Sequence, residues 1–287
     1  MSISSSSANL NLKNQKRDWL DLPSDVTANI LQRVGVSDIL EDAQKVCTAW
    51  RKICKDPCMW KVIKIVSFDD KMMGKKAVDR SQGQLVDISI CSCNDQLLSY
   101  VANRSRQLRR LEVVLHFDDE LRRISEHLMK FSLLEEFNLY SAGKSWKKSF
   151  IETAGRYCPM LKTLKLNQTP CNRLIGDNAN EVAIAIGENL HGLRHLELNG
   201  NNMSNIGLQA ILDGCVCLET LDLRKCMRID LNGDTGTRCF EQIRCVKLPS
   251  DSLEGSPHED IYEENIVPDY NLFYYYAPEL FDGYISQ

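Results

Sequence analysis

The chain has 287 residues, enough for one large domain or two small ones. Its residues are 43% apolar and 26% charged, as in a soluble globular protein, and its formal charge of −4 argues against a nucleic-acid binder, which is usually basic. The charge is uneven: residues 250–287 contain nine acidic side chains and no lysine or arginine, which marks them as a separate segment.

The first residues are polar and lack the apolar run of a signal peptide, so residues 1–16 are expected to be a disordered tail. No stretch approaches the roughly 18 apolar residues of a membrane span, which argues against a membrane partner. The twelve cysteines are therefore expected to be free thiols in a reducing compartment: the cytoplasm, the nucleus or both.

Residues 17–58 predict two or three short amphipathic helices. Pro23 suits the first turn of a helix. The apolar residues around and after it recur every four positions and form one stripe: Leu22, Val26, Ile30 and Val34. Gly35 is expected to end this helix and Ser37 to cap the next one.

A further helical pattern runs from Ala43 to Cys54 and is expected to stop at Asp56-Pro57. A unit of about forty residues is too small to be stable alone, so it should dock on the rest of the chain, on a partner, or on both. The apolar stripe is then either part of an internal core or a surface for a partner. Leu22-Pro23 at the start of the helix favours the partner surface.

Residues 59–250 contain about eight copies of the pattern Leu-x-x-Leu-x-Leu, with other apolar residues allowed. The first positions of the copies are Trp60, Leu85, Leu108, Leu134, Leu161, Leu193, Leu218 and Ile243. All steps between them fall within 23–27 residues except one of 32, which predicts an insertion near 169–177. Leucine-rich repeats have periods of about 20–29 residues, so this region is expected to be such an array.

Each triplet predicts a short strand with alternate side chains pointing inward, and copies of such a strand stack into a parallel sheet. Helical patterns follow the triplets, with Asn180 and Ser204 as expected N-caps. The predicted fold class is therefore α/β: a short all-α unit, then a leucine-rich-repeat solenoid with a parallel concave sheet and outer helices.

The first unit resembles an F-box. The resemblance spans residues 17–60 and rests on Leu22-Pro23, Ile30-Leu31, Val46-Cys47, Trp50-Arg51 and Trp60, in that order. It implies binding to the Skp-type adaptor, and through it to a cullin, in an SCF (Skp–cullin–F-box) ubiquitin ligase. The residues implied in or beneath the adaptor interface are Leu22, Pro23, Val26, Ile30, Leu31, Ile39, Leu40 and Trp50.

An F-box followed by such repeats resembles the plant F-box/LRR-repeat proteins. The resemblance implies a substrate-recognition subunit in ubiquitin-dependent protein degradation. It also implies that Cys158 and Cys215, before a triplet, and Cys93, Asn201 and Cys226, after one, satisfy backbone groups in the turns. Zinc binding is the alternative, but the pairs Cys91/Cys93 and Cys215/Cys217 lack the usual spacing of zinc ligands.

The third, fifth and seventh positions of each copy should project from the concave face of the sheet. Charges of both signs alternate there, which favours a protein substrate, of unknown identity, over a polyanion. The predicted substrate-facing residues are Arg110, Glu112, Glu136, Asn138, Tyr140, Lys165, Asn167, His195, Glu197, Asn199, Asp222 and Arg224.

The sequence offers no catalytic constellation, cofactor cradle or metal motif: none of the five histidines forms H-E-x-x-H, and G-x-S-x-G is absent. We therefore expect a non-catalytic subunit without cofactors. The alternative is a repeat protein that serves as an interaction scaffold without engaging a ligase, and a hydrolase or transferase on the same scaffold is the third class.

Residues 251–287 form an acidic, aromatic segment: residues 250–287 hold eight of the chain's seventeen Phe and Tyr side chains. Disordered segments are poor in aromatic residues, and an open solenoid needs its last apolar edge covered. Part of 261–287 is therefore expected to fold back as a cap, with a docking motif for a partner as the alternative.

Overall fold

The computed structural model describes Trp19 and residues 22–65, 71–91, 95–115, 120–141, 146–168 and 178–254. The expectations for 1–16, for Cys93, for the insertion near 169–177 and for the cap within 261–287 lie outside these described residues.

The N-terminal unit consists of short helices. They are α1 (Ser24–Leu31), α2 (Val36–Asp38), a π-helical turn η2 (Ile39–Ala43), α3 (Gln44–Val46), α4 (Thr48–Lys55) and a 3-10 turn η3 (Pro57–Trp60). As predicted, α4 stops before Asp56-Pro57, and the Asp56 side chain accepts a hydrogen bond from the backbone N–H of Cys58 at 2.9 Å. The indole of Trp60 is buried and donates to the carbonyl oxygen of Cys54 at 2.9 Å.

Two predicted helix boundaries in this unit are wrong. Helix α1 ends at Leu31 rather than at Gly35, because the N–H groups of Arg33 and Val34 bond three residues back and form a tight turn. Gly35 is extended and precedes α2, so Ser37 lies inside that helix instead of capping it.

The pattern from Ala43 to Cys54 is not one continuous helix. Cys47 adopts an extended conformation that separates α3 from α4. Its sulfur accepts a hydrogen bond from the N–H of Trp50 at 3.4 Å, so Cys47 acts as the N-cap of α4.

The repeats form one parallel sheet in which each strand pairs with the next strand in sequence. The described residues contribute β1 (Val62–Ile65), β2 (Asp87–Ile90), β3 (Arg110–Leu115), β4 (Glu136–Ser141), β5 (Thr163–Gln168), β6 (His195–Glu197), β7 (Thr220–Asp222) and β8 (Cys245–Lys247). The third positions of successive repeats face one another, as in Arg110 with Glu136 and His195 with Thr220. The predicted repeat register is therefore confirmed.

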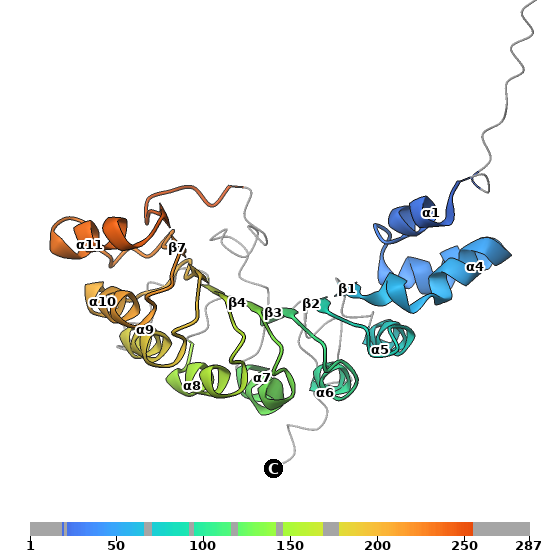
Figure 1. The fold of residues 1–287 in the computed structure, drawn as a ribbon, viewed down its shortest axis with the longest axis horizontal. Coiled ribbons are helices and arrows are strands. Elements are labelled where there is room, and N and C mark those ends of the chain that lie inside the picture. Colours follow the sequence, from blue (N-terminus) through green and yellow to red (C-terminus); the bar gives the residue numbers. More distant parts are fainter. Residues whose placement is uncertain are drawn as a thin grey trace, which may run out of the picture.

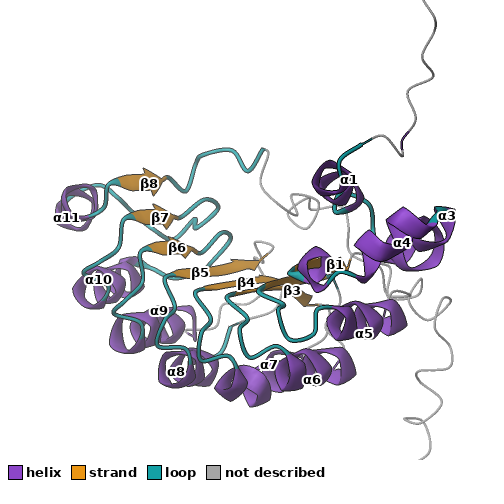
Figure 2. Cartoon of the chain, turned by 45° about the vertical axis from the view of Figure 1, so that its right-hand side comes forward, coloured by secondary structure: helices purple, strands orange, loops and turns teal. Residues whose placement is uncertain are grey.

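The helices lie on the outer side of the sheet, and the whole forms an arc with the strands along its inner side (Figures 1 and 2). They are α5 (Lys71–Arg80), α6 (Asp95–Arg104), α7 (Glu120–His127) with a 3-10 turn η4 (Leu128–Lys130), α8 (Lys148–Tyr157), α9 (Asn178–Asn189), α10 (Asn205–Gly214) and α11 (Asp234–Gln242). No helix in the described ranges is long and apolar enough to span a bilayer.

The two predicted helix caps differ in outcome. Ser204 does cap α10, where its hydroxyl accepts from the N–H of Ile206 at 3.4 Å. Asn180 is not a cap, because α9 already starts at Asn178. Its side-chain oxygen accepts instead from the N–H of Ser204 at 3.0 Å, linking the starts of two neighbouring helices.

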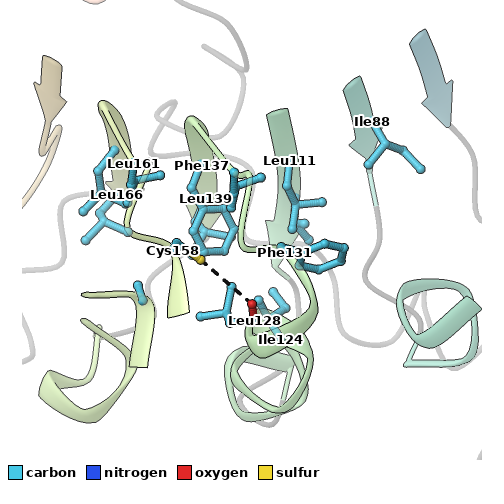
Figure 3. Close-up of a cluster of buried hydrophobic side chains, with 14 of the residues drawn as sticks. Ile88, Leu111, Ile124, Leu128, Phe131, Phe137, Leu139, Cys158, Leu161 and Leu166 are labelled. Carbon is cyan, nitrogen blue, oxygen red and sulfur yellow. Dashed lines mark hydrogen bonds between the residues drawn. The ribbon is translucent and has the colours of Figure 1, made fainter. Parts of the chain in front are cut away.

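The core is the stack of triplet side chains beneath the sheet. Figure 3 shows this stack, in which Leu111, Phe137 and Leu139 point from their strands towards the helical layer. Every triplet residue from Trp60 to Ile243 is buried, and only Val246 and Leu248, on the last copy, are half-buried. Burial in this stack is the main contribution to the stability of the solenoid, at about 25 cal/mol per Å² of apolar surface removed from water.

The cysteines of the turns play the structural role that the resemblance implied. The thiols of Cys215 and Cys226 donate to the carbonyl oxygens of Leu190 and Leu198, at 3.6 Å and 3.0 Å. Burial raises the pKa of both Cys215 and Cys226 to about 12, so each keeps the proton it donates. Asn201 likewise accepts from the N–H of Met203 at 2.8 Å.

The N-terminal unit packs against the first repeat, as its small size required. One continuous apolar cluster includes Leu31 and Leu40 from the unit and Ile63 from β1. Arg80 on α5 donates to the side chain of Gln44 at 3.2 Å, which ties the first repeat to α3.

Candidate functional site

The first candidate surface is the α1 stripe, defined as Leu22, Pro23, Val26, Ile30 and Val34. Pro23, Val26 and Val34 are exposed, with Val26 at 40%, and Leu22 and Ile30 are half-buried. The stripe therefore faces outward, and the interpretation as an internal core stripe is wrong.

The inward face of α1 is formed by other residues. Thr27 and Leu31, four positions apart, are buried against the rest of the unit. Among the residues implied for the interface, Leu31, Ile39 and Leu40 are likewise buried, so they can only support the surface from beneath.

Two aromatic side chains extend the α1 stripe. Trp50, on α4, is half-buried and meets Trp19 edge to face, with ring centroids 6.4 Å apart. Trp19 itself is 59% exposed. It was not among the predicted interface residues, although a tryptophan in a polar stretch three residues before Leu22 is a usable signal.

The neighbouring face of α4 is basic. Arg51, Lys52 and Lys55 are exposed and line a shallow hollow of about 460 Å³ together with Thr48 and Asp56. A partner that covers the α1 stripe and reaches this hollow would fit best with an apolar patch beside acidic side chains.

The second candidate surface is a groove on the concave side of the sheet. It has a volume of about 290 Å³ and crosses strands β4 to β8. Its lining includes five of the predicted residues: Glu136, Lys165, His195, Glu197 and Asp222. Thr163, Thr220, Cys245 and Lys247 also line it and were not selected, although they occupy the same repeat positions.

The carboxylates of the concave face are held by cations and amides. Arg110 donates to Asp87 at 2.9 Å and to Glu136 at 3.0 Å, and it also bonds Glu112. Burial lowers the pKa of the Arg110 guanidinium, but the three carboxylates outweigh burial and raise it above its ordinary value. The guanidinium is thus a fixed cation between β2 and β4.

A similar cluster surrounds Glu197 in the groove. Its carboxylate accepts from the amides of Asn167 at 2.6 Å and Asn199 at 2.9 Å, and Lys165 lies at 3.4 Å. His195 hydrogen-bonds the hydroxyl of Thr220 at 2.9 Å.

At the far end of the groove, Asp222 accepts from Arg224 at 2.7 Å and lies 3.1 Å from Lys247. The Arg224 guanidinium also donates to the carbonyl oxygen of Ser252 at 2.9 Å. Lys247, with half of its side chain exposed, retains further donor capacity for a ligand.

Several residues predicted to face a substrate are in fact enclosed. Asn138, Tyr140, Asn167 and Asn199 are at most 1% exposed. Glu112, Asp222 and Arg224 are also largely buried. The physical reason is that neighbouring strands bring side chains of the fifth and seventh positions close enough to bond along the sheet, so the accessible part of the face is narrower than predicted.

In the described ranges, no group of three or more His, Cys, Asp or Glu residues is arranged to hold a metal ion. Both surfaces are suited to binding: the α1 stripe through apolar contact, and the concave groove through paired charges of both signs.

The chain is similar to known proteins both in its N-terminal unit and over most of its length. The F-box-like family model matches residues 19–65. F-box/LRR-repeat protein 23 of Arabidopsis thaliana is 43% identical over 256 residues, which cover 84% of this chain and 56% of that protein. The chain thus spans little more than half of that relative's length.

Two further Arabidopsis thaliana proteins match over most of their own length. F-box protein SKIP19 is 40% identical over 263 residues, covering 87% of this chain and 84% of that protein. F-box/LRR-repeat protein 21 is 38% identical over 268 residues, covering 86% of each.

Proposed function

Because the chain belongs to the F-box/LRR-repeat protein family, we propose that it is a substrate-recognition subunit of an SCF-type ubiquitin ligase. In this proposal the α1 stripe binds a Skp-type adaptor, and through it a cullin, while the concave groove binds a protein substrate. The chain itself carries out no bond chemistry. Its contribution is to hold the substrate close to the ubiquitin-transferring machinery, which raises the effective concentration of the reacting groups.

The observation that carries the proposal is the exposure of the α1 stripe within the segment that matches the F-box-like family. An amphipathic helix ordinarily turns its apolar residues to the core. Here Val26 and Val34 face solvent while Thr27 and Leu31 pack inward. Covering such a stripe with a complementary apolar surface is favourable, and a contiguous exposed apolar patch is typical of a protein-interaction site.

The concave groove supports the substrate half of the proposal. Its carboxylates are already paired within the chain, so a partner is offered hydrogen bonds and local charges of both signs rather than a single-sign field. Such a surface gives specificity for a folded or extended protein segment. Lys165, His195 and Lys247 are among the accessible donors there.

Binding of the purified chain to a Skp-type adaptor tests the ligase half directly. A Leu22→Ala/Pro23→Ala double variant should bind at least roughly tenfold more weakly, as expected when interface anchors are removed. Val216→Ala is the matched control, because Val216 is 70% exposed on the solenoid, outside the N-terminal unit. Both variants should melt at the temperature of the unmodified chain.

The alternative function is an interaction scaffold that does not engage a ligase. It would be favoured if the unmodified, folded chain failed to bind any Skp-type adaptor. Adaptor binding that is equal in the double variant and the control would also overturn the proposed role of the α1 stripe.

A further inference from the structure

The last described strand, β8, leaves the sheet open at its outer edge. The middle residues of β6 and β7, Leu196 and Leu221, are buried, whereas Val246 in β8 is only half-buried. On the helical layer, Phe240 of α11 is 52% exposed. Within the described ranges the sheet ends at β8, so this end has the apolar surface of a repeat that lacks its neighbour.

The backbone hydrogen bonds of β8 also leave its outer edge available for a further strand. The N–H of Cys245 donates to Glu219, and the carbonyl of Lys247 accepts from Leu223, both towards β7. In a parallel strand the residue between them directs its N–H and C=O to the opposite side. The N–H and C=O of Val246 therefore point away from β7, just as β7 directs such groups towards β8.

The sequence after β8 has a matching pattern. Tyr270, Phe273 and Tyr275 have the spacing of the triplet, and Tyr270 follows Ile243 by 27 residues, the step that also separates Leu134 from Leu161. Aromatic side chains already occupy triplet positions in this chain, at Trp60 and Phe137. Residues 270–276 are rich in strand-favouring aromatic side chains, and prolines precede and follow them at 268 and 278.

We propose that residues 255–287 supply a ninth, aromatic repeat that closes the solenoid at β8. In this arrangement Leu272 lies beside Cys245 and Tyr274 beside Lys247, in the register of the other strands. Phe273 and Tyr275 cover Val246 and Leu248. The connection from Leu248 to Leu272 is long enough, because a parallel crossover needs roughly a dozen residues or more.

The distribution of charge also supports residues 255–287 as the segment that covers β8. Arg244 and Lys247 flank Val246 and are both exposed. Residues 255–287 carry seven acidic side chains and no lysine or arginine. A second copy of the chain, joined edge to edge at β8, would instead bring the basic residues of two copies together.

The test is made in the full-length chain. It uses the fact that side chains along the proposed strand would point alternately inward and outward. Phe273→Asp and Tyr275→Asp place a charge on the inward side and should speed backbone hydrogen exchange of residues 244–248 by roughly tenfold or more. They should also lower the melting temperature. Tyr274→Asp is the matched control one residue away. Its side chain would lie on the opposite, concave side of the proposed strand, so it should change neither quantity.

Deletion of residues 255–287 is the second measurement and should reproduce the effect of Phe273→Asp. The proposal is overturned if the deletion leaves the exchange of residues 244–248 unchanged, or if Tyr274→Asp acts like Phe273→Asp. Protection that rises with protein concentration, together with a dimer in light scattering, would assign the edge to a second copy instead. None of these readouts involves an adaptor, so they are independent of ligase engagement.

Discussion

Helix α1 and the repeat strands carry the same kind of sequence signal and use it in opposite ways. In the strands, periodic apolar residues such as Leu221 and Phe137 are buried in the stack. In α1 and the turn after it, the periodic residues Val26 and Val34 face solvent, while Thr27 and Leu31 form the inward face. Periodicity thus identifies an apolar surface, and the neighbours of that surface decide whether it becomes core or interface.

The largest expected effect is on the repeat side of this comparison. Leu221→Ala should lower the free energy of unfolding by about 2–5 kcal/mol, because the side chain is buried in a stack that cannot fully collapse around the cavity. Denaturant unfolding measures the change. Val216→Ala, four residues before the start of β7 and exposed, should stay within about 0.5 kcal/mol of the unmodified chain. Equal losses in both variants would contradict the register.

The buried polar side chains of the concave face should contribute to the free energy of unfolding, as core side chains do. Glu197→Ala leaves the buried amides of Asn167 and Asn199 without their acceptor and should cost about 1–3 kcal/mol in the same experiment. Glu181→Ala, at an exposed position on α9, is the control and should be close to neutral. A neutral Glu197→Ala would mean that the cluster contributes to binding alone.

A smaller effect is expected for the turn cysteines. Cys226→Ala removes a buried thiol that donates to Leu198 and should cost about 1–2 kcal/mol, from the lost hydrogen bond and the small cavity. Cys217→Ala changes an exposed thiol and should be neutral. A neutral result at Cys226 would show that the carbonyl of Leu198 needs no thiol partner.

The smallest effect on stability is expected on α1, where the effect on binding should be large. Val26→Ala should change the free energy of unfolding by no more than about 0.5 kcal/mol, because the side chain is exposed. Its affinity for a Skp-type adaptor, measured by calorimetry, should nevertheless fall. If Val26→Ala destabilised the chain as strongly as a core substitution, α1 would have to be oriented differently.

The sequence by itself predicted the repeat array, its register and the burial of the triplets, while the role of the turn cysteines was implied by the family resemblance. The physical reason is that each repeat packs on nearly identical neighbours, so local spacing determines which side chains face inward. The tertiary structure decided what depends on unlike elements in contact. Packing against α4 sets which face of α1 is outward, and the extended Cys47 divides the second helical pattern. Strand-to-strand bonding encloses Asn138 and Asn167 and leaves Lys165, His195 and Lys247 accessible, because access to a concave surface depends on what neighbouring strands place beside each residue.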